Sequence, residues 1–307
     1  MDKQIKIGLL IGAEKDWPDA FTAVLQQKQP TWQVKMLQLG FIDTNAPCSY
    51  DVIVDRMSHH VPFYRAYLKH AALQGCYIVN NPFVWGIDSK LFAGTLVDQL
   101  GWAQPRTVAL PNKYVEGVHT ADGFRNLLYP LDWHKLIDEI GLPAILKETR
   151  SGGRRITHRV HNLQELLNLY DDSGVLTMVL QQLIESDQHI HCLVVGDNQT
   201  HLFGYAHDEG KYLPTLAGIS DTDQQQMRNM AQTITKTFGY DVNLVDFVLA
   251  DDTIYITGTT NPFPIIDKEM MNDAQFDWCV QEMANMVIDR VQNPKPQKSP
   301  LAYAVSR

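Results

Sequence analysis

The chain has 307 residues and a mass of 34.9 kDa, a length that suits roughly two domains. Its composition is that of an ordinary globular protein, with 45% hydrophobic and 20% charged residues. The 35 acidic residues outnumber the 26 basic ones, which gives a net charge of −9 and a pI near 5.6. This balance argues against a nucleic-acid-binding protein, whose domains usually carry a basic face, but it allows a small basic pocket for a phosphate-bearing ligand.

Apolar runs and cysteines disfavour two further classes of protein. No apolar run approaches the ~18 residues of a membrane span, and residues 7–11 read as a buried first strand because Glu14 and Asp16 follow at once. The cysteines lie far apart, at Cys48, Cys76, Cys192 and Cys279. Their spacing supports neither a zinc site nor a disulfide framework, and we expect three of them to be inert core thiols. We therefore expect a cytoplasmic protein with no membrane partner.

Strands and helices alternate over the first 85 residues or so. Strands are expected at 6–12, 32–37, 50–55 and 75–80. Helices are expected after Asp16, which would cap the first one, and over 62–73. This alternation predicts a parallel α/β unit.

The rest of the chain changes from mixed to antiparallel structure. Residues 88–180 predict helices at 88–100, within 120–140 and at 162–170, strands at 105–110, 143–147 and 177–180, and a loop at 148–155. Beyond residue 181, two hairpins are expected, one across Asp197-Asn198 and one across Asp251-Asp252. Helices are expected at 220–237, capped by Ser220, and at 276–291, and the polar tail is expected to be loose.

A strand that ends in Lys147 precedes a loop rich in glycine and arginine. This loop holds Gly152 and Gly153 next to Arg150, Arg154 and Arg155. Adjacent glycines let backbone N–H groups approach phosphate oxygens, and the basic side chains suit a polyanion. A solvated surface turn with stray arginines explains the same residues equally well, so both interpretations stay open.

Two other groups of residues suggest metal chemistry. Asp246 and Asn261 offer a carboxylate and an amide oxygen, which suit Mg²⁺ together with substrate phosphates, although such pairs are mostly turn formers. His189 and His191 share one face of a strand, with His207 downstream. Zinc is an alternative there, but structural histidines are favoured because the spacing fits no finger motif.

Short motifs follow one another in a fixed order: Asn80-Asn81-Pro82, Asp88-Ser89-Lys90, Pro105-Arg106-Thr107, Asn112-Lys113, residues 143–147, residues 180–184, residues 189–196, Asp246 and Asn261. Their order and spacing resemble the ATP-grasp superfamily, in particular glutathione synthetase and the RimK-type carboxylate–amine ligases. The resemblance implies an α/β and α+β protein with an ATP-grasp fold and an N-terminal Rossmann-like pre-ATP-grasp domain. It divides the chain into a pre-ATP-grasp domain (1–105), a small lid subdomain (106–180), a large antiparallel subdomain (181–293) and a loose tail (294–307).

The resemblance also implies two cofactors, ATP and Mg²⁺, and a set of site residues. The ATP-binding residues would be Lys113, Lys147, Ser151, Gly152, Gly153, Gln181, Gln182, Leu183, Ile184 and His189. The metal ligands would be Asp246, Asn261 and Thr259. The catalytic residues would be His191, His207 and Arg154.

Four positions depart from the family pattern. Thr259 stands where the family has a metal-bridging glutamate, His189 where it has an acidic residue, and His191 and His207 where it has arginines. Loss of one carboxylate predicts weaker Mg²⁺ binding, with one ion in place of two, unless Asp267 or Asp241 compensates.

Two functional hypotheses follow. The first is an ATP-dependent ligase that joins a small-molecule or peptide carboxylate to an amine or thiol through an acyl phosphate. The second is a degenerate ATP-grasp module that binds nucleotide without ligase turnover. A nicotinamide-dependent dehydrogenase is disfavoured because residues 8–13 lack the GxGxxG spacing. Homo-oligomers are common among similar ligases, and the oligomeric state stays open.

Overall fold

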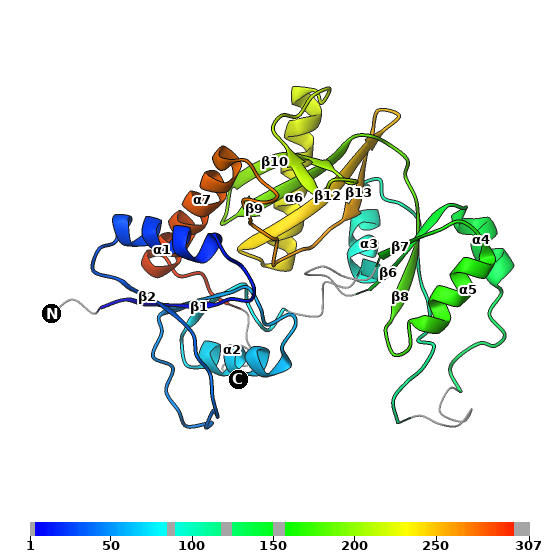
Figure 1. The fold of residues 1–307 in the computed structure, drawn as a ribbon. Helices are drawn as coiled ribbons and strands as arrows, with labels where there is room; N and C mark the ends of the chain where they lie inside the picture. The colour runs from blue at the N-terminus through cyan, green and yellow to red at the C-terminus, as the bar shows by residue number, and fades with distance from the viewer. Residues whose placement is uncertain (1–3, 85–89, 118–124, 150–156, 298–307) are drawn as a thin grey trace.

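The computed structural model describes residues 4–84, 90–117, 125–149 and 157–297, and it contains three sheets. We call them the N-terminal sheet (β1–β4), the lid sheet (β5–β8) and the large sheet (β9–β13). The large sheet lies between the other two (Figure 1). The expected mixture of a parallel α/β unit and antiparallel subdomains is confirmed.

The N-terminal sheet is parallel, as the alternation of elements predicts. Its strands are β1 (Lys6–Leu10), β2 (Gln33–Met36), β3 (Val52–Asp55) and β4 (Tyr77–Val79), in the order β2-β1-β3-β4. Successive residues of β1 enter different cores: Ile7 and Leu9 pack toward α1 (Trp17–Lys28), and Leu10 packs toward α2 (Pro62–Leu73). Asp16 precedes α1, but its side chain makes no capping hydrogen bond, which corrects the expected cap.

The large sheet is antiparallel, in the order β11-β10-β9-β12-β13. Its strands are β9 (His189–Val195), β10 (Gln199–Ala206), β11 (Lys211–Leu213), β12 (Val242–Ala250) and β13 (Thr253–Gly258). Both expected hairpins are present, and Asp251 and Asp252 adopt positive φ values of 47° and 56°, as a primed two-residue turn requires. The short strand β11 was not expected from the sequence.

Side-chain alternation in β9 gives the large sheet two different faces. Ile190 and Cys192 pack on α6 (Asp221–Phe238), which covers one face. Leu193 and Val195 pack on the other face against α7 (Asp273–Gln292), and His191 lies beyond the end of that core. One strand therefore supplies both a hydrophobic core and polar side chains for a site.

Helix α7 joins the large sheet to the N-terminal sheet. It packs against α1, and one hydrophobic core includes residues of both sheets (Figure 1). Its Arg290 is only 2% exposed, and its Nε donates to Asp241 at 2.7 Å. Beyond the helix, Lys295 pairs with Asp197, and the Gln297 amide bonds both backbone groups of Ile78, at 3.1 and 2.6 Å. The tail, expected to be loose from residue 294, is thus anchored as far as residue 297.

Helix α3 (Lys90–Gln99) belongs by its packing to the large sheet. Its Ala93 and Val97 lie in the same core as α6, and Ile256 of β13 donates to the carbonyl of Ala103 at 2.9 Å. The sequence placed residues up to 105 in the first unit, because local periodicity does not reveal which sheet a helix packs on. Asp88, part of a family motif, lies outside the described residues.

The lid sheet has the order β5-β8-β6-β7 and one covered face. Its strands are β5 (Thr107–Ala109), β6 (Ala144–Glu148), β7 (Thr157–Val160) and β8 (Met178–Gln182). Helices α4 (Trp133–Ile140) and α5 (Leu163–Asp172) cover one face, and Leu146 packs against them. The strand period of two therefore turns Lys147 to the opposite face. Strand β7 was not expected, and the helical stretch of 120–140 reduces to α4 among the described residues.

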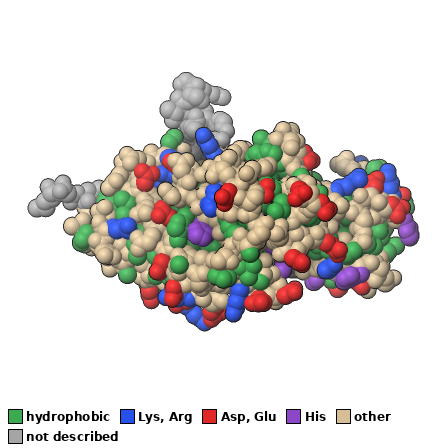
Figure 2. All heavy atoms as spheres, turned by 90° about the horizontal axis from the view of Figure 1, so that it is seen from above, with side chains coloured by type: hydrophobic (Ala, Val, Ile, Leu, Met, Phe, Trp, Pro, Cys, Tyr) green, Lys and Arg blue, Asp and Glu red, His purple; other side chains and the backbone are tan. Residues whose placement is uncertain are grey.

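The described surface is mixed in charge. On the face shown in Figure 2, acidic and basic side chains are interspersed and do not form a broad basic area. Among the described helices, none has the length and apolar character needed to cross a membrane.

Candidate functional site

Lys147 lies where the lid sheet meets the large sheet. Its Nζ donates to Gln181 Oε1 at 2.6 Å, within the lid sheet, and to the carbonyl of Thr257 on β13 at 3.2 Å. Burial, supported by the neighbouring Lys90, lowers the pKa of Lys147 to about 7, and the carboxylate of Asp246 acts in the opposite direction. The lysine thus spans both sheets and lies within electrostatic reach of the predicted metal ligand.

The space around Lys147 is narrow. A cavity of about 20 Å³ lies there, with walls from the lid sheet, α3 and β13: Lys90, Gly94, Gln104, Lys147, Gln181, Ile256, Thr257, Gly258 and Thr259. A volume of this size holds about one water molecule. The protein's own side chains therefore fill most of the space between the two sheets at this point.

Asp246 lies on the same face of the large sheet as His191. It is paired with Gly258 across the β12–β13 ladder, at a point where the register shifts. A side chain at Gly258 would collide with the Oδ2 atom of Asp246, so glycine is required for this carboxylate position. The Asp246 side chain is 40% exposed, which leaves it accessible to a cation.

His191 is enclosed by aromatic rings and by Asp246. Its Nε2 lies 3.6 Å from Asp246 Oδ1, and its Nδ1 lies 3.4 Å from the hydroxyl of Tyr212. Tyr205 stacks on the imidazole with ring centroids 4.3 Å apart. Burial lowers the pKa of His191, and Asp246 only partly opposes this effect. A neutral imidazole here differs from the permanent cation that an arginine would supply.

His189 and His207 lie further along the same face. Their rings meet edge to face at 5.1 Å, and Tyr205 contacts His207 at 5.5 Å. Burial lowers the pKa of His189, and the neighbouring His207 adds to the effect. Among the described residues, no cluster of three His, Cys, Asp or Glu side chains could hold a metal ion, so the zinc alternative gains no support.

The predicted Mg²⁺ ligands offer one carboxylate. Asn261 lies beside β12, where its carbonyl accepts from Leu244 N at 3.0 Å, and its Oδ1 accepts from Phe263 N at 3.2 Å. The side chain of Thr259 is half-buried and neutral. Mg²⁺ usually binds one or two carboxylates together with substrate phosphates, so this donor set fits one phosphate-bound ion.

Both carboxylates expected to replace the glutamate of the family pattern have other partners. Asp241 is buried and paired with Arg290, and it also accepts from the hydroxyl of Tyr77 at 2.8 Å. Asp267 caps its own turn by accepting from Glu269 N at 2.9 Å. The expectation that one of them compensates for Thr259 therefore gains no support.

Lys113 and the hinge are placed differently from Lys147. The Nζ of Lys113 pairs with Asp171 of α5 at 2.5 Å, on the exposed surface of the lid. In the hinge, the backbone N–H of Gln182 donates to the carbonyl of Arg106 at 2.8 Å. Leu183 and Ile184 follow it and are half-buried. The predicted loop residues Ser151, Gly152, Gly153 and Arg154 lie outside the described residues.

Sequence reasoning missed several groups that surround the site. Lys90 and Thr257 lie next to Lys147, and Tyr205 and Tyr212 surround His191. The period of two in β10 could have placed Tyr205 and His207 on one face. The contact with Tyr212 depends on the unexpected strand β11.

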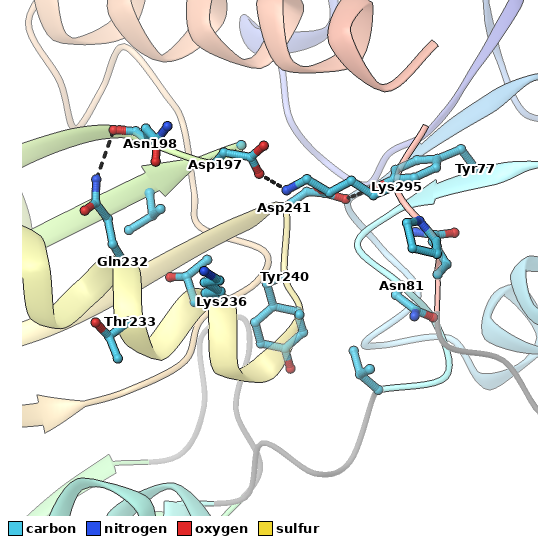
Figure 3. A pocket seen from close by; sticks show the side chains of 17 residues that line it. Tyr77, Asn81, Asp197, Asn198, Gln232, Thr233, Lys236, Tyr240, Asp241 and Lys295 are labelled. Carbon is cyan, nitrogen blue, oxygen red and sulfur yellow. Dashed lines mark hydrogen bonds and ion pairs between the residues drawn. The ribbon is translucent and has the colours of Figure 1, made fainter. Parts of the chain in front are cut away.

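A larger cavity, of about 670 Å³, lies away from these residues, between the end of α6 and the tail (Figure 3). Gln232, Lys236 and Tyr240 line one side, and Tyr77 and Lys295 the other. Its acidic residues Asp197 and Asp241 are already engaged by basic partners. This cavity contains none of the predicted site residues.

Comparisons with known proteins identify the fold. No family model and no curated protein sequence matches the chain. A RimK domain ATP-grasp protein from Sphaerobacter thermophilus matches with a TM-score of 0.68 at 14% identity, over 92% of this chain and 98% of that one. D-alanine–D-alanine ligase from Bacillus anthracis, complexed with ATP, matches with a TM-score of 0.68 at 13% identity, over 95% and 98%. VanG D-Ala:D-Ser ligase from Enterococcus faecalis matches with a TM-score of 0.63 at 13% identity, over 94% and 100%.

Proposed function

The chain has the fold of the ATP-grasp superfamily, and we propose that it is an ATP-dependent ligase that joins a carboxylate to an amine. The observation that carries the proposal is Lys147, a half-buried lysine of the lid that lies within electrostatic reach of Asp246 on the large sheet. A cation on one wall and a carboxylate on the other suit a metal-bound triphosphate held between them.

The proposed binding of ATP requires the lid sheet to move away from β13. Opening breaks the hydrogen bond of Lys147 to the Thr257 carbonyl, and the ammonium group then binds phosphate oxygens. The N–H of Gln182 is already bonded to Arg106, so Leu183 and Ile184 are the hinge positions that would contact the adenine edge. In its open position the lid would admit substrates, and in its closed position it would exclude water from the reaction.

The proposed metal position is next to Asp246 and Asn261. ATP supplies the phosphoryl group that activates a carboxylate as an acyl phosphate, and Mg²⁺ neutralises charge on the phosphates. The chain's own residues bind and orient: Asp246 and Asn261 hold the ion, and Lys147 holds the phosphates. Thr259 adds a neutral oxygen where the family pattern has a carboxylate. We propose that the site therefore binds one Mg²⁺ ion.

The proposed role of His191 is to position the reacting groups. With its lowered pKa, the imidazole is mostly neutral near pH 7 and can donate one hydrogen bond while its other nitrogen accepts one. His207 and the loop residue Arg154 would contact the transferred phosphoryl group. The acid and the amine are small molecules or peptides, and the protein is proposed to act in the cytoplasm.

Phosphate release from ATP tests this proposal. The full chain is assayed with Mg²⁺, ATP and mixtures of carboxylic acids and amines, and the variants are Lys147→Ala and Lys135→Ala. We expect Lys147→Ala to lower phosphate release by about 100-fold, because a preorganised charge on the phosphates is lost. Lys135 is an exposed lysine of α4 and serves as the matched control, with release unchanged. Equal release by Lys147→Ala and the unmutated chain would contradict the proposal.

A second candidate function is a module that binds ATP without turnover. The half-buried, neutral Thr259 and the mostly neutral His191 favour it, because both lower the charge available for phosphoryl transfer. Calorimetry separates the two candidates. Binding of Mg-ATP that Lys147→Ala weakens, with no phosphate release for any acid and amine, supports the module, and absence of ATP binding contradicts both.

A further inference from the structure

Two cysteines of the N-terminal unit lie together although they are far apart in the sequence. Cys48 lies in the loop before β3, and Cys76 directly precedes β4. Because β3 and β4 are parallel neighbours, with Val52 opposite Tyr77, the segments that lead into them lie at the same end of the sheet, where both strands begin. Cys76 belongs to the core between this sheet and α2, Cys48 packs against that core, and each thiol shifts the pKa of the other.

The loop around Cys48 is fastened to the end of α2. The backbone N–H of Cys48 donates to Gln74 Oε1 at 2.5 Å. Nε2 of Gln74 and Nε2 of His70 both lie 2.9 Å from the carbonyl of Ala46. These bonds hold the backbone of the loop at Cys48 against the end of α2.

The surroundings of the two sulfur atoms are unequal. Cys48 is half-buried, and its Sγ lies 3.7 Å from the Tyr50 carbonyl and 4.0 Å from the hydroxyl of Tyr67. The neighbouring Cys76 side chain lowers the pKa of Cys48 to about 6; burial opposes this, while the Tyr50 backbone, Tyr67 and His70 support it. Cys76 is buried, and the same contact together with burial raises its pKa. One partner is therefore an accessible thiolate and the other a buried thiol.

We propose that Cys48 and Cys76 form a peroxide-reactive thiol pair that closes to an intramolecular disulfide. The Cys48 thiolate attacks one oxygen of a hydroperoxide, the O–O bond breaks, and the other oxygen leaves as water or an alcohol after taking up a proton. The sulfur of Cys76 then attacks the sulfur of the Cys48 sulfenic acid. The S–O bond breaks, water leaves, and the S–S bond forms. The two thiols lose two electrons, and these reduce one peroxide.

The other two cysteines provide an internal comparison. Cys192 and Cys279 are buried in the cores on either face of the large sheet. Burial raises the pKa of each thiol to about 12. A thiol with such a pKa carries little thiolate at neutral pH and reacts slowly with peroxide.

Mass spectrometry of the native full chain tests the proposal. The reduced chain is treated with one equivalent of hydrogen peroxide at pH 7, its remaining thiols are alkylated under denaturing conditions, and its peptides are mapped. We expect a loss of two hydrogen atoms, alkylation of Cys192 and Cys279 alone, and one linked peptide that joins Cys48 to Cys76. Dithiothreitol should restore all four thiols.

Variants assign the order of the steps. Cys76→Ser should stop at a sulfenic acid on Cys48, which dimedone traps, and Cys48→Ser should consume peroxide about 10-fold more slowly, since the accessible thiolate is absent. Cys192→Ser is the matched control and should form the linked peptide as the unmutated chain does. The proposal is overturned if the linked peptide does not form, or if Cys48→Ser and the unmutated chain consume peroxide at the same rate. These readouts do not depend on ATP or on ligase activity.

Discussion

Lys147 donates a 2.6 Å hydrogen bond to Gln181, its diagonal neighbour on the face of the lid sheet that lies opposite α4 and α5. Gln181 in turn donates from Nε2 to the hydroxyl of Thr107 at 2.8 Å, so the lysine is held by a chain that crosses β6, β8 and β5. The hydrogen bonds are made to neutral oxygens, and burial disfavours the charged ammonium. We therefore expect the charge of Lys147 to depend on whether an anionic group lies next to its Nζ atom.

The first prediction concerns stability and pH. The pKa of Lys147 is lowered to about 7 in the folded chain, whereas the unfolded chain has an ordinary lysine near 10.5. Between these two values the unfolded state binds more protons, so the free energy of unfolding rises with pH over this window; below about pH 7 the full cost of the buried charge remains. We expect Lys147→Met to lack this rise, so that its difference from the unmutated chain changes by about 3 kcal/mol between pH 7 and 9.5.

Urea unfolding at the two pH values measures this difference. The exposed residue Lys135 supplies the control, because Lys135→Met should follow the unmutated chain at both pH values. A difference between Lys147→Met and the unmutated chain that does not vary with pH would show that Lys147 titrates as an ordinary lysine.

The second prediction is proton uptake on ATP binding. At pH 8 most of the free protein carries a neutral Lys147, and a triphosphate next to it would stabilise the ammonium form. Binding should then take up about one proton per ATP, which calorimetry in buffers of different ionisation enthalpy measures. Lys147→Arg is permanently charged and should bind ATP with uptake near zero. Equal uptake by both proteins would place the titrating group elsewhere.

The third prediction tests the contact between Gly258 and Asp246. In Gly258→Ala the new methyl group would collide with the Oδ2 atom of Asp246 and displace the carboxylate. We expect Mg-ATP to bind at least about 10-fold more weakly, a loss of roughly 1.4 kcal/mol. Gly40→Ala is the control, because a side chain there meets no atom within 4 Å and the backbone is not left-handed. Thermal shifts with Mg-ATP compare the two variants, and equal shifts would argue against Asp246 as a metal ligand.

The fourth prediction restores a carboxylate at residue 259. Thr259→Glu adds a negative charge on the strand end next to Gly258, and the Mg²⁺ concentration needed for half-maximal ATP binding should fall by about 10-fold. Thr259→Gln has nearly the same shape without the charge and should leave that concentration unchanged. Titration of Mg²⁺ at fixed ATP gives both values. A similar fall in the two variants would mean that shape, and not charge, limits metal binding.

Local patterns in the sequence predicted most strands and helices well, because these elements depend on the period of the hydrophobic residues and on the residues that form turns. The apolar strand that ends in Lys147 and the Asp251-Asp252 turn were both identified before any contact was known. The order of the motifs predicted the fold. The short strands β7 and β11 were missed because three or four residues give too little periodicity to recognise.

Contacts between distant segments were the part that the sequence could not supply. Lys113 was expected at the phosphates, but the structure pairs it with Asp171, an acidic residue that no motif singled out. Cys48 and Cys76 were considered by spacing along the chain, whereas the parallel pairing of β3 and β4 brings them together. Such contacts depend on how whole elements pack, and one sequence does not encode that in a local pattern.

The fifth prediction concerns Asn80, which joins the N-terminal sheet to the large sheet. Its Oδ1 accepts from the backbone N–H groups of Asp241 and Val242, at 2.7 and 2.9 Å. Its Nδ2 donates to the carbonyls of Val242 and Pro262, at 2.9 and 3.0 Å. The side chain is buried, so Asn80→Ala leaves four backbone groups without this partner. We expect the free energy of unfolding to fall by about 3 kcal/mol.

Denaturant unfolding measures this loss against a matched variant. Asn229 lies on the exposed side of α6, where its side chain accepts a hydrogen bond from Gln225 of the same helix, and Asn229→Ala should change stability by less than about 0.5 kcal/mol. Asn80→Asp is a second test, because it keeps the shape and the acceptor but replaces the donor, and it should lose most of the same free energy by facing two carbonyl oxygens with a carboxylate. If Asn80→Ala were as stable as Asn229→Ala, the hydrogen bonds of Asn80 would contribute little to holding the two sheets together.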